Sequence, residues 1–312
     1  MTTYIIRRLL YTIPIVFGVL LLTFTLFTLV RGDVSLELAG KNATPETIEE
    51  IKEEYGLNKP LFFSWDSQFI NHFKNALTFN FGRARDRELV TDKIKRGMGP
   101  SLTLMIPMFF GIVLISVSLA LIIAFVRNSI WDVTAVVICV VGMSLPYLSF
   151  ILFGQYFFAY KWGWFPVFFS PGLAPAEYIA LPVLIGIVAG LGGNLRFYRT
   201  IMLDELRNDY VRTAFAKGLT TRQVLFKHVL KNAMIPIITR VVMAIPFLFL
   251  GSLLLERFFG IPGLGYLMIE AIGSRDYFVI NAMTYISSIL FVVFNLITDV
   301  CYALVDPRVS FD

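Results

Sequence analysis

The sequence predicts an all-α membrane protein with six transmembrane helices. Hydrophobic residues make up 57% of the 312 residues and charged residues only 16%, whereas soluble domains average about 45–50% and about 25%. The apolar stretches are long and unbroken and do not alternate with period two. Because a bilayer admits only helices or closed barrels, this pattern favours helices.

The first apolar stretch, Leu9–Val30, follows Arg7 and Arg8. It exceeds the roughly 7–15 apolar residues of a signal peptide and no convincing cleavage site follows, so we expect an uncleaved first span. Five later stretches approach or exceed the ~20 residues that cross the hydrocarbon core. They are Leu102–Val126, Val133–Tyr160, Tyr178–Leu195, Ala233–Leu255 and Ile280–Leu304.

The distribution of Lys and Arg over the short loops predicts the orientation. Cytoplasmic loops are enriched in these residues. Placing both termini in the cytoplasm leaves only Lys161, Arg257 and Arg275 in the outer short loops. The opposite side then holds Arg7, Arg8, Arg127, Arg308 and the strongly basic loop 196–231.

We expect three parts along the chain. Residues 1–30 form an N-terminal transmembrane helix, residues 31–100 an extracytoplasmic region with short helices, and residues 101–312 a five-helix core that contains the cytoplasmic loop 196–231. The region 31–100 is neutral, with 11 Lys or Arg and 11 Asp or Glu. Long translocated loops largely escape the positive-inside rule, so this region can lie outside.

Two short helices are expected in the region 31–100. Thr44 is a helix cap, Pro45 a first helical residue and Gly56 a helix stop, which predicts a surface helix over Pro45–Tyr55. The segment Phe62–Phe79 is rich in aromatic residues, which suggests a helix that lies on the membrane or packs on the outer face.

The basic loop carries the most informative segment, YVRTAFAKGLTTRQVLFKHVLKNAMIP, from Tyr210 to Pro236. Gly218 is a natural helix stop, and Thr220 or Thr221 is a cap for the next helix, so the segment predicts a helix, a tight turn and a second helix. Pattern alone leaves two interpretations. Another protein docks on the segment, or it is a solvated basic loop that touches anionic lipid.

The segment resembles the coupling motif of binding-protein-dependent ABC importer permeases, which has Glu-Ala-Ala, three residues, Gly and an apolar tail. The matching residues are Arg212, Thr213, Ala214 and Gly218, with Leu230 in the tail. Arg212 replaces the usual Glu, as is typical of peptide permeases, where YVRTAxAKGL occurs. The likeness runs nearly end to end, through RRLL near the start, GLNKPL at 56–61, ERFFGIPGLGYL at 256–267, RDY at 275–277 and DPR at 306–308.

The chain therefore resembles the B-type membrane subunit of the oligopeptide/dipeptide (peptide/nickel) family. That resemblance implies a type I ABC importer permease fold in a bacterial or archaeal cytoplasmic (inner) membrane. It implies four kinds of neighbour: a homologous second permease subunit, two ABC ATPase subunits, an extracytoplasmic solute-binding protein and the lipid bilayer. The usual cargo is di- or oligopeptides, and close relatives move nickel complexes, glutathione or oligosaccharides.

The resemblance also implies two sets of site residues. The ATPase-coupling residues are Arg212, Thr213, Ala214, Lys217, Gly218 and Leu219. The residues of an extracytoplasmic gate loop near the solute-binding protein are Glu256, Phe258, Pro262, Gly263, Gly265 and Asp276.

The source of energy separates the function classes. The chain has no G-x-x-x-x-G-K-[ST] motif, so we expect ATP and Mg to be bound by partner ATPase subunits. We expect no catalytic residue, cofactor, metal or nucleic acid for this chain. An ion-coupled secondary transporter is the alternative, and it usually carries acids or histidines deep in its spans. In this chain the apolar cores of the spans are almost free of charge. The exceptions are Arg240 and Asp299, whose matching depths in their spans predict a structural ion pair. A receptor or scaffold without transport is the third class.

Overall fold

The computed structural model describes residues 2–26, 28, 35, 44–54, 56–62 and 64–305. In this part of the chain, helices are joined by turns, and one isolated β-bridge links Arg83 with Leu89. The chain forms two compact units. The first comprises Met1–Gly97 and Leu267–Leu296, and the second comprises Met98–Tyr266 and Ile297–Asp312.

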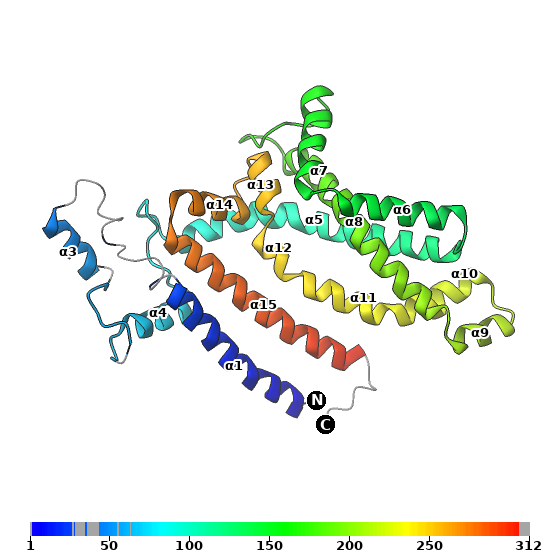
Figure 1. Cartoon of the computed structure of the whole chain (residues 1–312), viewed down its shortest axis with the longest axis horizontal. Helices are drawn as coiled ribbons and strands as arrows, with labels where there is room; N and C mark the ends of the chain where they lie inside the picture. The colour runs from blue at the N-terminus through cyan, green and yellow to red at the C-terminus, as the bar shows by residue number, and fades with distance from the viewer. Residues whose placement is uncertain are drawn as a thin grey trace. The chain divides into compact units, whose positions relative to one another are not determined.

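The first unit is built on helices α1 (Thr2–Thr25) and α15 (Tyr277–Val305), which lie side by side (Figure 1). Leu20 of α1 and Tyr285 of α15 are buried in one apolar cluster. The apolar part of α1, Leu10–Thr25, is shorter than the span expected over Leu9–Val30. The end of that expected span includes residues 27, 29 and 30, which lie outside the described residues.

Helix α3 (Pro45–Glu54) confirms the predicted surface helix. The Thr44 hydroxyl accepts a hydrogen bond from the backbone N–H of Thr47 at 3.3 Å. Gly56 ends the helix with φ +65°, the left-handed conformation that favours glycine. Tyr55, the last residue of the expected helix, lies outside the described residues.

Helix α4 (Gln68–Leu77) is shorter than the aromatic segment Phe62–Phe79 because Ser67 caps it, accepting from the N–H of Ile70. Its rings pack on α1. The ring of Phe69 lies 5.9 Å from that of Phe17 and 5.3 Å from that of Phe24. The choice between lying on the membrane and packing on the outer face stays a prediction.

The second unit contains most of α5 (Val90–Phe125) and the long helix α8 (Pro175–Glu205), which packs against both α6 (Ile130–Ser144) and α11 (Leu230–Ala244) (Figure 1). Its remaining elements are α7 (Tyr147–Gly154), the π-helix η2 (Gln155–Lys161), α9 (Asp209–Ala216), α10 (Thr221–Val224), the π-helix η3 (Leu225–Val229), α12 (Pro246–Leu250) and α13 (Leu253–Phe259). Helix α14 (Leu264–Ser274) begins in this unit and continues in the first.

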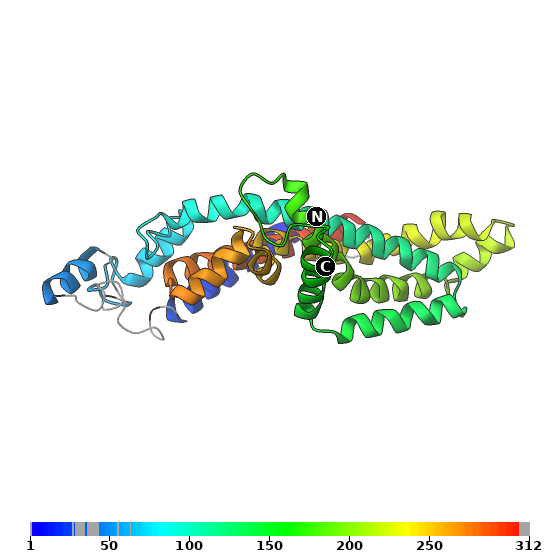
Figure 2. The same cartoon turned by 90° about the horizontal axis from the view of Figure 1, so that it is seen from above.

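The apolar stretch Val133–Tyr160, expected as one span, is sharply bent in the structure. Helices α6 and α7 meet at an angle of 93° (Figure 2). Leu145, which precedes Pro146, has extended backbone with φ −85° and ψ 133°. A residue before proline is disfavoured in the helical conformation, whereas proline can lead into the next helix. The Leu145-Pro146 pair therefore breaks the apolar stretch into two helices.

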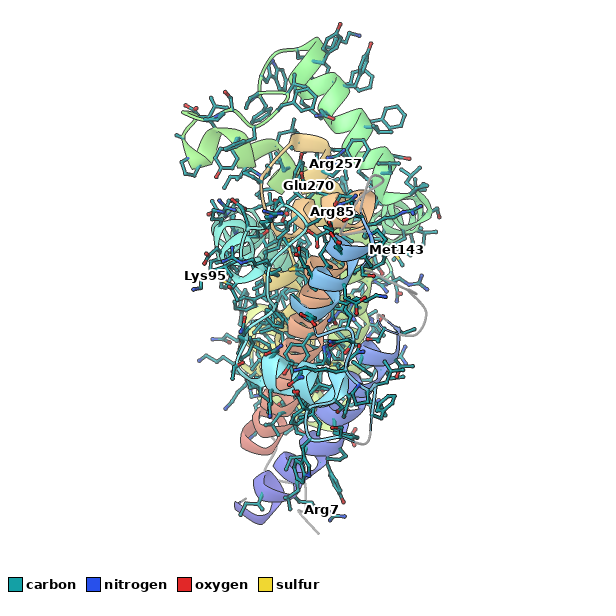
Figure 3. All side chains as sticks on the ribbon, turned by 90° about the vertical axis from the view of Figure 1, so that its left-hand side faces the viewer. Arg7, Arg85, Lys95, Met143, Arg257 and Glu270 are labelled. Carbon is teal, nitrogen blue, oxygen red and sulfur yellow. The ribbon has the colours of Figure 1, made fainter. Side chains whose placement is uncertain are left out.

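Four helical runs in the described residues are long and apolar enough to cross a membrane, and the bent pair α6–α7 is a fifth candidate. The four runs are Val90–Phe125, Pro175–Glu205, Thr221–Phe259 and Tyr277–Thr298. The count of six spans therefore stays a prediction. Side chains project outward along the helices (Figure 3). Many of the exposed side chains are large and apolar, for example those of Ile130 and Trp131. Such surfaces suit lipid, which solvates apolar side chains.

Candidate functional site

Helix α9 lies in the middle of the basic loop, between α8 and α10. It stops where Gly218 adopts φ +79° and donates its N–H to the carbonyl of Phe215 at 2.9 Å. Thr220 then caps α10. Its hydroxyl accepts from the N–H of Gln223, and the Gln223 side chain accepts from the N–H of Thr220 at 3.0 Å. The predicted helix, turn and helix are confirmed, with Thr220 as the cap.

One face of α9 is buried against its own chain. Val211 is 2% exposed and Ala214 is 4% exposed. The methyl side chain of Ala214 lets α9 approach an apolar cluster that six other elements share. Members of that cluster include Ala120 and Ala124 of α5, Tyr198 and Met202 of α8, Leu225 and Val229 of η3, and Ala233 and Ile237 of α11. Because interiors are close-packed, a displacement of α9 is passed to these helices.

The opposite face of α9 is exposed. It carries Arg212, Thr213 and Lys217, together with Phe215, whose exposed fraction is 43%. Among the residues that the structure describes, the one ion pair of Arg212 is with Asp209, at 3.4 Å between two largely exposed side chains. This face presents a guanidinium, an ammonium and a phenyl ring outward.

The turn after α9 has a different role. Gly218 is exposed, and a Cβ added to it would meet no atom within 4 Å. Its positive φ is the reason for glycine at this position. Leu219 is half-buried and packs beside the cluster that holds Ala214.

Tyr210 anchors the start of α9, a contact that sequence reasoning missed. Its hydroxyl donates to the carboxylate of Glu205 at the end of α8, and the side-chain amide of Asn208 donates to the same oxygen at 2.9 Å. Burial and the bond to Glu205 raise the pKa of the Tyr210 hydroxyl, which therefore stays protonated. The available signal in the sequence was the position of Glu205, five residues before Tyr210 and on the other side of a turn.

A second missed contact joins α6 to α8. Arg199 donates to both oxygens of Asp132, from Nε at 2.6 Å and from Nη2 at 2.7 Å. Asp132 also accepts from the backbone N–H of Asn128 at 3.0 Å, and its side chain is 5% exposed. Two parallel bonds between a guanidinium and a carboxylate fix both distance and angle. Asp132 lies one residue before the apolar stretch Val133–Tyr160. No motif near Asp132 in the sequence indicates Arg199 as its partner.

The carboxylate of Glu256 is the centre of the predicted gate loop. The residue is fully buried and makes three hydrogen bonds within the second unit. Oε1 accepts from the hydroxyl of Ser101 at 2.7 Å and from the N–H of Ser252 at 3.1 Å, and Oε2 accepts from the N–H of Tyr266 at 3.0 Å. The Ser101 oxygen in turn accepts from the N–H of Leu264 at 2.7 Å. One carboxylate thus ties α5 to both ends of the loop.

Three glycines make room for this carboxylate and for the chain that folds over it. A Cβ at Gly251 would lie 2.2 Å from Oε1 of Glu256, and one at Gly263 would lie 2.4 Å from Oε2. A Cβ at Gly265 would lie 2.7 Å from the backbone of Ser252. Real Cβ atoms do not approach so closely, so glycine is required at these positions.

Two other predicted gate residues are less buried than Glu256. Pro262 is exposed and Phe258 is half-buried. The carbonyl of Phe258 accepts from the side-chain amide of Gln155 at 3.0 Å, and the same amide donates to the carbonyl of Val167 at 2.9 Å. Gln155 therefore links η2 to α13, another contact without a sequence signal.

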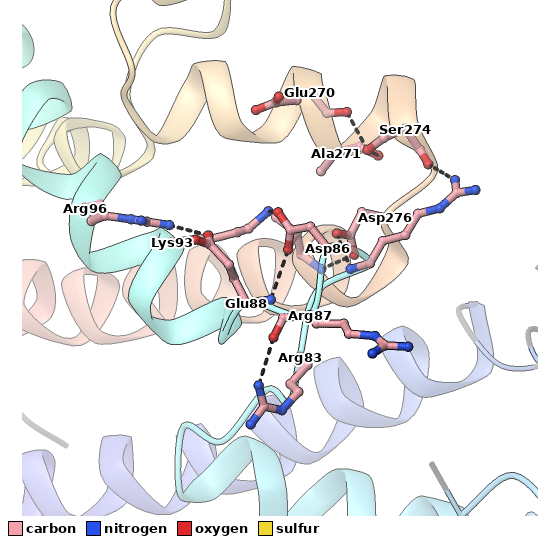
Figure 4. Close-up of polar contacts among 12 residues, drawn as sticks. Arg83, Asp86, Arg87, Glu88, Lys93, Arg96, Glu270, Ala271, Ser274 and Asp276 are labelled. Atoms are coloured by element: carbon pink, nitrogen blue, oxygen red, sulfur yellow. Dashed lines mark hydrogen bonds and ion pairs between the residues drawn. The ribbon is translucent and has the colours of Figure 1, made fainter. Parts of the chain in front are cut away.

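Asp276 belongs to the first unit (Figure 4). It is buried, accepts from the backbone N–H of Arg85 at 2.9 Å, and caps α15 by accepting from the N–H of Val279 at 3.4 Å. The side chain of Arg85 donates to the carbonyl of Ser274 at 2.6 Å. Asp276 thus holds the segment around residue 85 to the start of α15.

Arg240, expected to pair with Asp299, is held by α8. Its Nε donates to the side-chain oxygen of Asn194 at 3.3 Å, and its guanidinium carbon lies 4.3 Å from the ring centroid of Phe197. The side chain of Asp299 lies outside the described residues, so the expected pair stays a prediction.

Comparison with known proteins agrees with this architecture. Residues 116–311 match the family described as "binding-protein-dependent transport system inner membrane component", and residues 1–85 match its N-terminal part. The glutathione transport system permease protein GsiC of Escherichia coli (strain K12) is 34% identical over 312 residues, which covers 100% of both chains. The oligopeptide transport system permease protein AppB of Bacillus subtilis (strain 168) is 34% identical over 320 residues, again 100% of both.

The match over residues 116–311 defines an inner-membrane component of a binding-protein-dependent transport system, and the apolar helical runs agree with that class. The chain belongs to the ABC importer permeases of the oligopeptide/dipeptide (peptide/nickel) family.

Proposed function

We propose that the chain is the membrane-spanning subunit of an ATP-driven importer that moves di- or oligopeptides, including glutathione-like tripeptides. A second permease subunit completes the path across the membrane, two ATPase subunits bind ATP and Mg, and an extracytoplasmic solute-binding protein delivers the cargo. Both termini and the loop around α9 face the cytoplasm. This chain itself holds no cofactor and catalyses no reaction.

The construction of α9 is the observation that supports this proposal most strongly. Its inner face is packed against α5, α8 and α11, and its outer face is exposed and basic. A solvated loop has no need of a tightly packed inner face. A helix that transmits the closing motion of an ATPase pair needs both faces, one for the partner and one for the spans.

The gate residues have a role in the same scheme. Glu256, with Gly263 and Gly265 around it, gives the loop that follows α13 a fixed shape. A loop of fixed shape is a suitable outer surface for a solute-binding protein, since little conformational entropy is lost on docking.

The names of the relatives guide the choice of cargo. One is a glutathione permease and another is an oligopeptide permease, at the same 34% identity. We favour peptides as the class that covers both. Nickel complexes and oligosaccharides are the alternatives within this machinery. An ion-coupled secondary transporter is the alternative of another class, and it predicts uptake without ATP.

The proposal is tested on the complete assembly purified from native membranes and reconstituted in vesicles. Gly218→Val forces a side chain into the left-handed conformation, at a cost of roughly 1–2 kcal/mol, and so distorts the turn after α9. We expect the ATPase subunits to co-purify with the unaltered chain, and the variant to hydrolyse ATP with little peptide uptake or to lose the ATPase subunits. Gly142→Ala is the matched control, because a Cβ there meets no atom within 4 Å.

A second pair of variants tests the exposed face directly. Arg212→Ala combined with Lys217→Ala should weaken ATPase binding without unfolding the chain, since both side chains are exposed. Ala214→Leu should instead disrupt the buried cluster and lower the thermal stability of the chain. Purification of the chain without any ATPase, with ion-driven uptake, would refute the proposal in favour of a secondary transporter.

A further inference from the structure

The guanidinium of Arg240 is a charged group on the exposed surface of an apolar helix. Arg240 belongs to α11, inside the run Thr221–Phe259 that is long and apolar enough to cross a membrane. Its side chain is exposed, whereas Ile237 and Val242 on the same helix are buried. An ionisable side chain at such a position is costly toward lipid and normally faces a polar partner or a water-filled path.

The contacts of Arg240 fix the direction of its side chain, but they use only some of the hydrogen-bond donors of its guanidinium. Nε is used by Asn194, whose own amide donates to the carbonyl of Gly190 at 2.9 Å and so holds its oxygen toward Arg240. Phe197 covers one face of the guanidinium. Among the described residues, no carboxylate forms an ion pair with it. The four N–H groups of Nη1 and Nη2 therefore form a pre-oriented fork.

A guanidinium fork binds carboxylates through two parallel hydrogen bonds. We propose that Arg240 binds a carboxylate of the transported solute as it crosses the membrane. This inference rests on the proposed function, because every di- or oligopeptide and glutathione carry at least one carboxylate at neutral pH. Two other sources of the same group are an acidic side chain of the other permease subunit and Asp299, whose side chain lies outside the described residues, and the experiment below separates them from the solute.

The first measurement does not depend on transport. The complete assembly is treated with phenylglyoxal, a water-soluble reagent for arginine, and the modification of Arg240 is followed by mass spectrometry. We expect Arg240 to be modified and to be protected by a dipeptide with a free C-terminal carboxylate, but much less by the same dipeptide as its C-terminal amide. Arg127, which is exposed and lies outside this cluster, should react equally in all samples.

Three results would overturn the inference. Equal protection by the acid and the amide would show that the carboxylate is not recognised. Lack of modification in the presence and absence of the second permease would show that Arg240 faces lipid or pairs with Asp299 of its own chain. Lack of modification in the assembly, followed by modification when the second permease is removed, would assign the carboxylate to that subunit.

The second measurement is ATP-driven uptake of the dipeptide in vesicles with saturating solute-binding protein. We expect Arg240→Gln to lower uptake about tenfold or more, the loss of one charge-assisted pair, while ATP hydrolysis stimulated by the binding protein is retained. Arg240→Lys should keep part of the uptake, because it keeps the charge without the fork. Arg127→Gln is the matched control.

The two proposals fail in different ways. Normal uptake by Arg240→Gln would remove the carboxylate site and leave the importer intact. Absence of ATP-driven uptake by the unaltered assembly, together with selective protection of Arg240 by the free acid, would refute the proposed function and keep the carboxylate site.

Discussion

Arg199 on α8 holds Asp132 at the start of α6 through two hydrogen bonds of 2.6 and 2.7 Å. The Asp132 side chain is almost fully buried, and the Arg199 side chain is mostly buried. Asp132 and Arg199 are 67 positions apart in the sequence. Their pair joins α6 to α8 and fixes how the two helices cross at this end.

Removal of the guanidinium should be costly because a buried carboxylate loses its partner. We expect Arg199→Met to lower the free energy of unfolding by about 3–5 kcal/mol. The double variant with Asp132→Asn should recover part of that loss. Arg212→Met is the matched control, since its pair with Asp209 is exposed and should contribute little. A double-mutant cycle on thermal unfolding measures the coupling, and additive effects would contradict the prediction.

The Glu256 carboxylate should be needed for its acceptor capacity. Glu256→Gln replaces one accepting oxygen by an N–H donor, so either Tyr266 or the Ser101–Ser252 side of the site loses a partner. We expect a loss of about 1–3 kcal/mol, with faster hydrogen exchange over residues 251–266. Glu270→Gln, at an exposed position, is the control. Unchanged exchange in the Glu256 variant would show that the carboxylate does not hold the loop.

Gly263 should not tolerate even a methyl group. An added Cβ would lie 2.4 Å from Oε2 of Glu256 and 2.4 Å from the Ser101 hydroxyl. We expect Gly263→Ala to destabilise the chain by about 1–3 kcal/mol. Gly273→Ala should be neutral or slightly stabilising, because a Cβ there meets nothing within 4 Å and alanine favours helix. Thermal unfolding of the two variants measures the difference. Equal stability of Gly263→Ala and Gly273→Ala would contradict the explanation that Glu256 and Ser101 leave no room for a Cβ at Gly263.

His72 should make the contact between α1 and α4 sensitive to acid. Its Nε2 is buried and has no hydrogen-bond partner within the described part of the chain, and its ring lies 5.6 Å from Phe24. Burial lowers the pKa of His72 below its ordinary 6.5. The unfolded state therefore binds the proton first, and stability falls as the pH drops below about 6.5 until the folded pKa is reached.

Hydrogen exchange of α4, corrected for intrinsic rates, measures this effect. We expect protection of Gln68–Leu77 to fall between neutral and mildly acidic pH in the unaltered chain. His72→Phe should remove much of the fall, whereas His228→Gln, at the other histidine, should not. An identical pH profile for His72→Phe would assign the sensitivity to other groups.

Local structure could be read from the sequence wherever a short motif determines it. Thr44 and Gly56 bounded α3, and Gly218 and Thr220 bounded the turn after α9. In each case the responsible atoms lie within a few residues of one another.

Contacts between distant segments could not be read in this way. Ser101 meets Glu256 across 155 positions, and the sequence holds no sign of that pairing. For the bend between α6 and α7, Pro146 itself was the signal in the sequence, because the residue before a proline disfavours the helical conformation. The size of the bend could not be read, since the apolar stretch is long enough for one span and hydrophobicity alone does not show how sharply the Leu145-Pro146 pair interrupts it.

The π-helix Leu225–Val229 takes up one extra residue between α10 and α11, which continue each other through it. A π turn holds one residue more than an α turn, so the helices on either side keep nearly the same phase about their common axis. Deleting one residue within Leu225–Val229 would therefore let the helix become regular and leave α10 close to its present orientation. One residue of regular α-helix corresponds to about 100° of rotation, so the same deletion in α11 would turn α10 and the basic face of α9 by about that angle. The π turn is thus the place in this helix where the length of the chain can change without redirecting the basic face.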